Sequence, residues 1–203
     1  MLKLYNDPFA PSPRRVRMFM AEKAIEYERI DLSIAAGETQ NAGFLALNPL
    51  GEVPVLVLDD GQCLTESLAI CRYLEQRFPE PPLLGVDALE QTRIDSVVQR
   101  IMFRAYVPST LAFRHTHKFW QGRIEQVPEF GAIAKQQVLD EWQLLNDTLA
   151  ERPFMAGDQF SFADIVAYTT LEFGKPSGIR VNDHQTHLKR WQAEIAARPS
   201  AKA

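Results

Sequence analysis

The first 75 or so residues alternate between strand-like and helix-like patterns of apolar positions. Residues 2–5 (LKLY) predict a short buried strand. Over residues 13–24 the apolar side chains recur at spacings of three and four, which is typical of one helix face. A second strand is expected at 27–32 (YERIDL), and a short helical segment around 44–47. The continuous, β-branched run at 53–58 (VPVLVL) predicts a third strand.

A turn signal, Asp59-Asp60-Gly61, follows the third strand, so residues 62–64 (QCL) can return beside it as a hairpin. That connection is too short for anything but an antiparallel pair. The first two strands instead enclose a helix, which favours a parallel pair with a right-handed crossover. A further helix face is marked by Leu68, Cys71, Leu74 and Phe78. The expected order is βαβαββα, a small mixed sheet with helices on its faces.

A proline-rich break at 78–85 (FPEPPLLG) is the best candidate for a domain boundary, because strand signals nearly vanish after it. We therefore expect an α/β domain at 1–78, a linker at 79–87 and an all-helical domain at 88–203.

Helical stripes fill the second part of the chain. Their apolar positions are Ile94, Val97, Val98, Ile101 and Ala105, then Ala134, Val138, Trp142, Leu145 and Leu149. Pro108 is expected to kink or end the first of these helices. Ser161 and Asp164 have the spacing of a capping box at the start of another helix. A last helix is expected at about 184–197.

Composition narrows the function classes. The chain has 203 residues, 46% of them hydrophobic and 24% charged, which is ordinary for a globular protein. Its net charge of −4 gives no basic surface of the kind that binds nucleic acid. The short basic cluster of Arg14, Arg15 and Arg17 is interpreted as a local surface that favours anions or as a solvated helix face, the latter being preferred. No signal peptide and no run long enough for a membrane span are found, so a cytoplasmic protein is expected. The two cysteines, Cys63 and Cys71, match no metal or disulfide spacing and are expected to be buried fillers.

Pro54, inside the third predicted strand, would normally argue against a strand. A cis peptide bond before Pro54 would start the strand from a tight turn and leave the N–H and C=O of Val53 facing outward. An extended peptide could then pair with that edge. The alternative is a trans proline at a strand start with no ligand.

The segment TESLAI (65–70) marks the start of the next helix. Thr65 is expected to be its N-cap, and Ser67 is then a hydroxyl beside free backbone N–H groups, which suits a ligand carboxylate. Glu66 could accept from a ligand ammonium group. The alternative is a plain capped helix with an acidic first turn.

Ser12 precedes Pro13, which suits a first helical position, so Ser12 is expected to be an N-cap. Its hydroxyl could also donate to a group bound above the helix end. A bound thiol would ionise more readily there, because the hydrogen bond and the helix dipole both favour a thiolate. Ser12, Pro54 and the 65–67 segment are expected to meet at one end of the sheet, where open α/β sheets bind ligands.

Three segments, residues 12–32, 44–61 and 64–79, resemble the N-terminal domain of cytosolic glutathione transferases, with NPLGEVP and ESLAI as the specific motifs. Residues 152–168 resemble the capping segment of their helical domain. The resemblance implies a bacterial member of the family, with a thioredoxin-like domain, a helical domain that contributes the electrophile pocket, and a homodimer.

The resemblance also implies the chemistry. Glutathione would be the co-substrate, with no metal. Val53 would pair with its cysteinyl unit, while Glu66 and Ser67 would hold its γ-glutamyl end. Ser12 would stabilise the thiolate for attack on an electrophile, a detoxification reaction, or for reduction of a disulfide or peroxide.

The sequence departs from the family pattern at two positions. An alternative to an enzyme therefore stays open, a non-catalytic glutathione-binding or regulatory protein with the same fold. Relatives with a serine or cysteine often carry it five residues before Arg15, where this chain has Ala10; Ser12 falls where another subgroup has asparagine. Glu52 stands where relatives often have lysine or glutamine near the glycyl carboxylate, and Arg14 is one candidate to offset it. A glutaredoxin-like dithiol enzyme is disfavoured, because positions 9–13 hold no cysteine.

Overall fold

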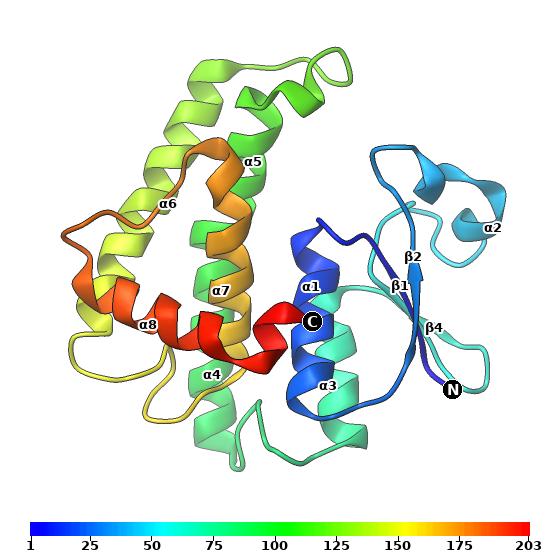
Figure 1. Ribbon diagram of the computed structural model, residues 1–203, viewed down its shortest axis with the longest axis horizontal. Coiled ribbons are helices and arrows are strands. Elements are labelled where there is room, and N and C mark those ends of the chain that lie inside the picture. Colours follow the sequence, from blue (N-terminus) through cyan, green and yellow to red (C-terminus); the bar gives the residue numbers. More distant parts are fainter. The chain divides into compact units, whose positions relative to one another are not determined.

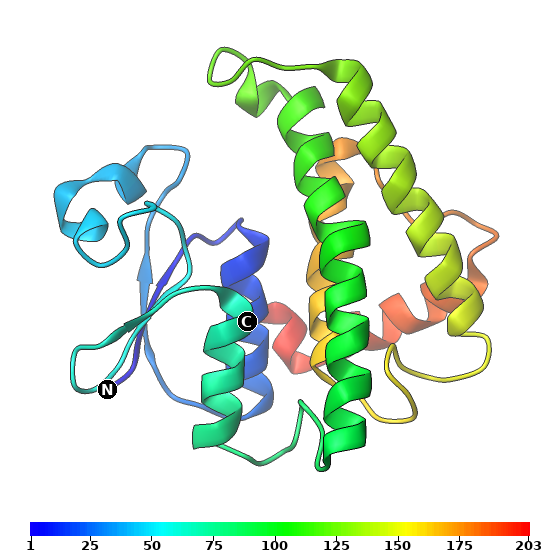
Figure 2. The ribbon, with the colours of Figure 1, turned by 180° about the vertical axis from the view of Figure 1, so that it is seen from behind.

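The computed structural model describes residues 1–203 and divides the chain into two compact units (Figures 1 and 2). The first unit comprises residues 1–82 together with 199–203, and the second comprises residues 83–198. The C-terminal residues 199–203, which the sequence analysis placed in the second domain, thus pack within the first unit. None of the helices is both long and apolar enough to cross a lipid bilayer.

The first unit contains a mixed four-stranded sheet in the order β2-β1-β3-β4. The strands are β1 (Lys3–Asn6), β2 (Glu28–Asp31), β3 (Val55–Val57) and β4 (Cys63–Leu64). β1 and β2 are parallel, while β3 is antiparallel to both β1 and β4. The predicted parallel first pair and antiparallel last pair are both confirmed.

Helices α1 (Pro11–Glu22) and α3 (Ser67–Arg77) lie side by side against the sheet (Figures 1 and 2). The shorter elements of this unit are η1 (Glu38–Gln40), α2 (Ala42–Leu45) and η5 (Pro199–Lys202). The core between helices and sheet is fully buried at Leu4, Phe19, Leu56, Ile70 and Leu74. The structure therefore has the predicted βαβαββα order, with α1 beginning two residues earlier than expected.

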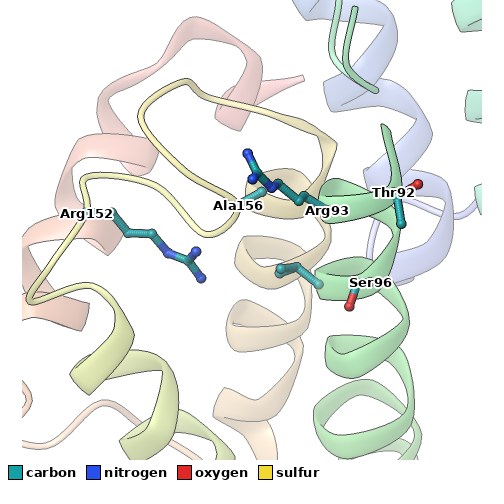
Figure 3. A pocket seen from close by; sticks show the side chains of 6 residues that line it. Thr92, Arg93, Ser96, Arg152 and Ala156 are labelled. Atoms are coloured by element: carbon teal, nitrogen blue, oxygen red, sulfur yellow. The ribbon is translucent and has the colours of Figure 1, made fainter. Parts of the chain in front are cut away.

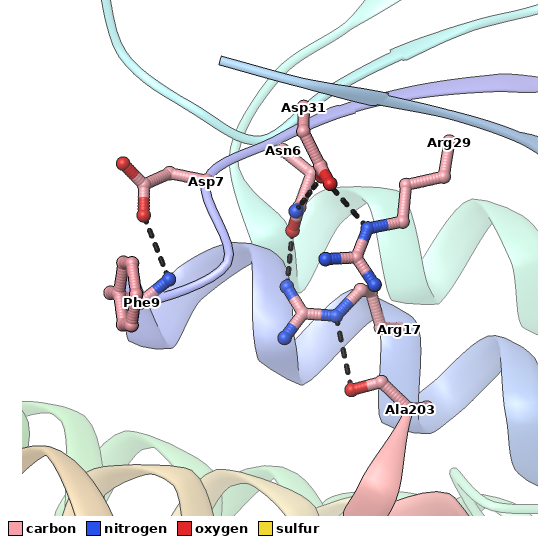
Figure 4. Close-up of polar contacts among 7 residues, drawn as sticks. All are labelled: Asn6, Asp7, Phe9, Arg17, Arg29, Asp31 and Ala203. Atoms are coloured by element: carbon pink, nitrogen blue, oxygen red, sulfur yellow. Dashed lines mark hydrogen bonds and ion pairs between the residues drawn. The ribbon is translucent and has the colours of Figure 1, made fainter. Parts of the chain in front are cut away.

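A buried polar network joins α1 to the sheet and to the C-terminal segment (Figure 4). The Arg17 guanidinium donates from Nη1 to Asn6 Oδ1 and from Nε to the carbonyl of Ala203, the latter over 3.1 Å. Asn6 in turn donates to Asp31 on β2 over 2.5 Å. Burial, and then the nearby charge of Arg29, lower the pKa of Arg17 to about 10. Arg17 and Arg15 are buried, so their interpretation as part of a solvated face is wrong.

The second unit is helical. Its elements are α4 (Ala88–Ile101), η2 (Met102–Tyr106), α5 (Val107–Thr116), η3 (Lys118–Trp120), α6 (Pro128–Thr148), α7 (Phe162–Gly174), η4 (Lys175–Ser177) and α8 (Thr186–Ala197). Every residue from 161 to 171 is buried, so α7 forms the centre of this unit. A helix that is surrounded on all sides by protein is expected to be apolar on every face, as α7 largely is.

Pro108 does not end its helix. The chain instead passes from α4 through the π-helical segment η2 into α5, and the Val107 N–H donates to Met102 O, five residues back. Proline supplies no backbone N–H, so the regular hydrogen-bond ladder must be interrupted at this point. The π-helical turn accommodates this interruption, and the helix continues from α4 into α5.

The predicted capping box at the start of α7 is confirmed, and Asp164 does more than cap the helix. Its buried carboxylate accepts from the N–H of Met155 at 2.9 Å, the N–H of Ser161 at 3.0 Å and Trp191 Nε1 at 2.8 Å. Burial raises the pKa of Asp164, and these hydrogen bonds oppose that rise. One side chain therefore joins α7, α8 and the loop before α7.

We predict that Asp164→Ala lowers the free energy of unfolding by about 3 kcal/mol, because three buried donors lose their acceptor. Urea denaturation followed by circular dichroism measures the change. Asp158→Ala is the matched control, because Asp158 is exposed in the same loop region and should change stability little. Equal stability of the two variants would contradict this role for Asp164.

Candidate functional site

The sheet register brings three loop regions to one end of the first unit. Tyr5 near the end of β1 lies opposite Val55 at the start of β3, and Leu56 lies opposite Leu64 at the end of β4. The segment after β1, the Pro54 turn and the segment before α3 must therefore share one end of the sheet. The convergence expected from the sequence is present in the structure.

The loop between β1 and α1 is held by Asp7. Its carboxylate accepts from the N–H of Phe9 at 2.8 Å and from the N–H of Ile34 at 2.9 Å. These bonds attach the loop to itself and to the segment after β2. The entry into α1 is therefore fixed by side-chain hydrogen bonds as well as by proline.

Ser12 is not the N-cap of α1, so that prediction is wrong. Ala10 occupies the N-cap position with extended backbone (φ −76°, ψ 134°), and the helix begins at Pro11. Both Pro11 and Pro13 are compatible with a first helical turn, and the chain enters the helix at the earlier one. Ser12 is a partly buried residue of the first turn. It lies at the positive end of the helix dipole, where Pro11 and Pro13 supply no N–H. The Arg14 N–H donates to the carbonyl of Ala10 over 3.4 Å.

The peptide bond between Val53 and Pro54 is cis, which confirms the first of the two alternatives for this turn. Asn48 holds the turn by donating from Nδ2 to the carbonyl of Glu52 over 2.8 Å. Neither the N–H nor the C=O of Val53 takes part in a hydrogen bond within the chain. The structure thus leaves the backbone of Val53 available to an extended ligand.

Glu66, and not Thr65, occupies the N-cap position of α3, so the prediction for Thr65 is wrong. The Glu66 backbone has φ 64° and ψ 110°, a conformation that favours glycine. A non-glycine residue in such a conformation costs of order 1–3 kcal/mol and is found preferentially at ligand sites. The side chain of Glu66 is exposed.

Ser67 is the first residue of α3 and is buried. Its Oγ accepts a hydrogen bond from Arg15 Nη1 over 2.7 Å, and Arg15 is itself fully buried. A hydroxyl that accepts from a guanidinium still has its own proton to donate. Ser67 can therefore donate to a ligand carboxylate while Arg15 holds it in place.

Arg15 is the functional residue that the sequence reasoning missed. It lies next to Val16 on the inner side of α1, but three arginines within four positions suggested a solvated face. The signal that could have found it is the position of Arg15, four residues before the buried Phe19 on the same helix face.

The surroundings of Glu52 leave the expected glycyl-carboxylate subsite without an identified cation. Glu52 is exposed, and the Arg14 guanidinium donates to the carbonyl of Ala201 over 3.0 Å. Gln40 Nε2 lies 3.4 Å from the carbonyl of Gly51 and is a neutral donor near this turn.

Neither cysteine lies in the loop before α1. Cys71 is fully buried in α3, where burial raises the pKa of its thiol, whereas Cys63 in β4 is partly exposed and so is not the buried filler expected. No cluster of three or more His, Cys, Asp or Glu side chains is arranged to hold a metal ion.

Comparison with known proteins identifies the family. Residues 9–77 match the family model of the glutathione S-transferase N-terminal domain, and residues 131–199 match that of the C-terminal domain. The chain is 33% identical to "Glutathione S-transferase 2" of Saccharomyces cerevisiae, with 98% of this chain and 87% of that protein covered. It is 29% identical to "Maleylacetoacetate isomerase" of Pseudomonas aeruginosa, with 98% and 93% covered.

A solved structure agrees with these matches. A glutathione S-transferase domain-containing protein of Marinobacter aquaeolei is 34% identical, with 98% of each chain covered and a TM-score of 0.91. The predicted fold class, a thioredoxin-like domain followed by a helical domain, is confirmed by these matches and by the described elements. The chain belongs to the glutathione S-transferase family.

Proposed function

We propose that this protein is a glutathione transferase that binds glutathione at the common end of β1, β3 and α3 and ionises its thiol. The observation that carries the proposal is the convergence of three groups in one unit. They are the first turn of α1 with Ser12, the unpaired backbone of Val53 and the start of α3 with Glu66 and Ser67.

Glutathione would be held by the polar groups of this site. The γ-glutamyl carboxylate accepts from Ser67 Oγ and from the free N–H groups at the start of α3, where the helix dipole also favours an anion. The γ-glutamyl ammonium pairs with Glu66. The cysteinyl unit pairs with the N–H and C=O of Val53, as in strand addition. The expected domains belong to this proposal, with 1–78 binding glutathione, 79–87 as linker and the helical segment from 88 contributing the electrophile pocket, except that residues 199–203 pack with the first unit.

The transferase reaction requires the thiolate form of glutathione, held close to the electrophile. An unperturbed thiol has a pKa of about 8.5, so only a few per cent is ionised at neutral pH. The Ser12 hydroxyl donates to the sulfur, and the N-terminal end of α1 favours the negative charge. The thiol proton leaves to solvent, the thiolate electron pair forms a bond to the electrophilic carbon, and the leaving group takes the electrons of the bond that breaks.

The loop before α1 determines which sulfur atom reacts. With no cysteine in the loop before α1, the sulfur that reacts is that of glutathione. The same thiolate can attack a disulfide or a peroxide as well as carbon. A cytoplasmic location would suit this reaction, because thiols stay reduced there.

The rival is a non-catalytic glutathione-binding protein, which Ala10 and Glu52 favour. Immobilised glutathione and an aryl halide conjugation assay separate the two. Retention without turnover would favour the rival, while turnover that depends on Ser12 would favour the enzyme.

A homodimer is part of the proposal, supported by apolar side chains left exposed on the second unit. Phe103 in η2 and Ile133 in α6 are each 68% exposed, and Leu144 in α6 is 47% exposed. Single exposed apolar residues are common, but aromatic residues are enriched at protein interfaces, which makes Phe103 the sharpest test.

We predict that Ser12→Ala raises the pKa of the bound glutathione thiol by about one unit and lowers kcat/KM at neutral pH about tenfold, because the sulfur loses its hydrogen-bond donor. Thiolate ultraviolet absorbance across a pH titration measures the pKa. Ser12→Thr, which keeps a hydroxyl donor, should leave the thiol pKa and kcat/KM close to the wild-type values. An unchanged thiol pKa in Ser12→Ala would remove Ser12 from this role.

We predict that Glu66→Gly stabilises the protein by about 1 kcal/mol while raising the KM for glutathione. Glycine relieves the positive φ, and the carboxylate that pairs with the ligand ammonium is lost. Glu66→Gln is the control, because it removes the charge but keeps the backbone cost. Thermal unfolding and steady-state kinetics measure both effects; an unchanged KM in both variants would exclude Glu66 from the site.

We predict that Phe103→Asp converts a dimer into a monomer, because a charge would be buried at the interface. Light scattering coupled to size-exclusion chromatography measures the mass. Val86→Asp is a control, because Val86 is similarly exposed, at 72%, but lies outside the helices. A monomeric wild-type protein would contradict the dimer.

A further inference from the structure

The second unit contains an open cavity of about 390 Å³ between α4 and the loop that follows α6 (Figure 3). It is lined by Thr92, Arg93, Ser96, Val97, Arg152 and Ala156. Two of these six residues are arginines and none is acidic. The cavity therefore has a positive lining without a carboxylate to neutralise it.

Arg152 places a donor without an acceptor at this cavity. Its Nε atom is buried and has no hydrogen-bond partner. A buried N–H that gives up water without gaining a partner is destabilising, so such groups are rare in native structures. In Figure 3 the guanidinium of Arg152 extends from the loop towards α4. The charge of the Arg152 guanidinium is not neutralised by an acidic side chain of the protein, so a bound anion at the cavity would neutralise it.

Arg93 extends from α4 towards the same loop and forms no hydrogen bond or ion pair within the chain (Figure 3). Two arginines further along the same helical segment, in α4 and η2, do have acidic partners. Arg100 and Arg104 share the buried carboxylate of Glu141, at 2.5 and 2.7 Å. The protein thus neutralises one pair of arginines internally and leaves the other pair, Arg93 and Arg152, facing the cavity.

The loop that carries Arg152 is held in place by other contacts. Arg190 Nη2 donates to the carbonyls of Leu149, Arg152 and Pro153 at 3.1, 3.3 and 3.3 Å. Further along, the Met155 N–H is bound by Asp164. The loop is therefore ordered without any ligand, so a ligand would pay little for ordering it.

We propose that this cavity binds a small organic anion, a phosphate ester or a carboxylate with an apolar body. The anionic group lies between the Arg93 and Arg152 guanidinium groups, whose planar donors match oxyanions in pairs. Ser96 supplies a further hydroxyl donor, whereas the Thr92 hydroxyl already donates to the carbonyl of Ala88 at 2.7 Å. The apolar body lies against Val97 and Ala156. The cavity volume falls within the usual range for small-ligand sites, and this inference does not depend on the proposed glutathione site.

The test follows the arginine Nε–H resonances of the full chain by NMR while phenyl phosphate is added. Saturating glutathione is present, so that the site of the first unit does not compete. We expect a saturable shift of the Arg152 Nε–H resonance, assigned by its loss in Arg152→Gln. In Arg93→Gln the reporter remains, and the affinity should fall about tenfold, because one charge-assisted contact is lost.

The controls separate the outcomes. Arg180→Gln removes an exposed arginine elsewhere in the same unit and should leave the affinity unchanged. Benzoate distinguishes a carboxylate from a phosphate ligand, and binding of either supports the proposal. A shift that does not saturate, saturation with inorganic phosphate at the same affinity as phenyl phosphate, or equal affinity in Arg93→Gln would overturn it. Glutathione conjugation should be unchanged in Arg93→Gln, so a failure of the glutathione proposal would not affect this result.

Discussion

The hydrogen bond from Arg15 to Ser67 is the contact on which the arrangement of the first unit depends. Both side chains are buried, and the bond joins the second turn of α1 to the first residue of α3. Lys23, just beyond α1, pairs with Glu75 near the end of α3 at 2.7 Å, so the two helices are parallel and in register. Their N-terminal ends therefore lie together. Two positive dipole ends side by side would repel each other, and an anionic ligand relieves that repulsion.

Burying a guanidinium is costly, and removing one of its hydrogen-bond acceptors raises that cost, which restricts what the neighbouring positions can be. Replacing Ser67 with an apolar residue would remove the acceptor of Arg15 Nη1 as well as the contact that we propose Ser67 makes with glutathione. In the proposed site, one substitution at Ser67 would therefore change both the stability of the protein and its affinity for glutathione. They are separable at Glu66, where the side chain is exposed and the cost lies in the backbone.

Much of the fold could be predicted from the sequence, because period-two and period-3.6 patterns and proline positions are local signals. The parallel and antiparallel strand pairs and the capping box at Ser161 and Asp164 are all read from short segments. The errors at Ser12 and Thr65 have a common cause. Both assumed that a hydroxyl side chain marks the N-cap, whereas the structure begins these helices from Ala10 and from the left-handed backbone of Glu66. Burial of Arg15 and Arg17 depends on contacts more than ten residues away in sequence, which periodicity does not reveal.

The carbonyls of Ala201 and Ala203 accept from Arg14 and Arg17, and Ser200 pairs with Glu22. Residues 199–203 thus complete a unit whose remainder lies at 1–82. A ribosome makes these residues only after it has made the entire helical unit. While more than a hundred residues are translated, Arg14 Nη2 and Arg17 Nε of the α/β unit lack their C-terminal acceptors, and water must take the place of these carbonyls. Its final closure is coupled to the completion of its neighbour, so the two halves cannot mature as fully independent modules.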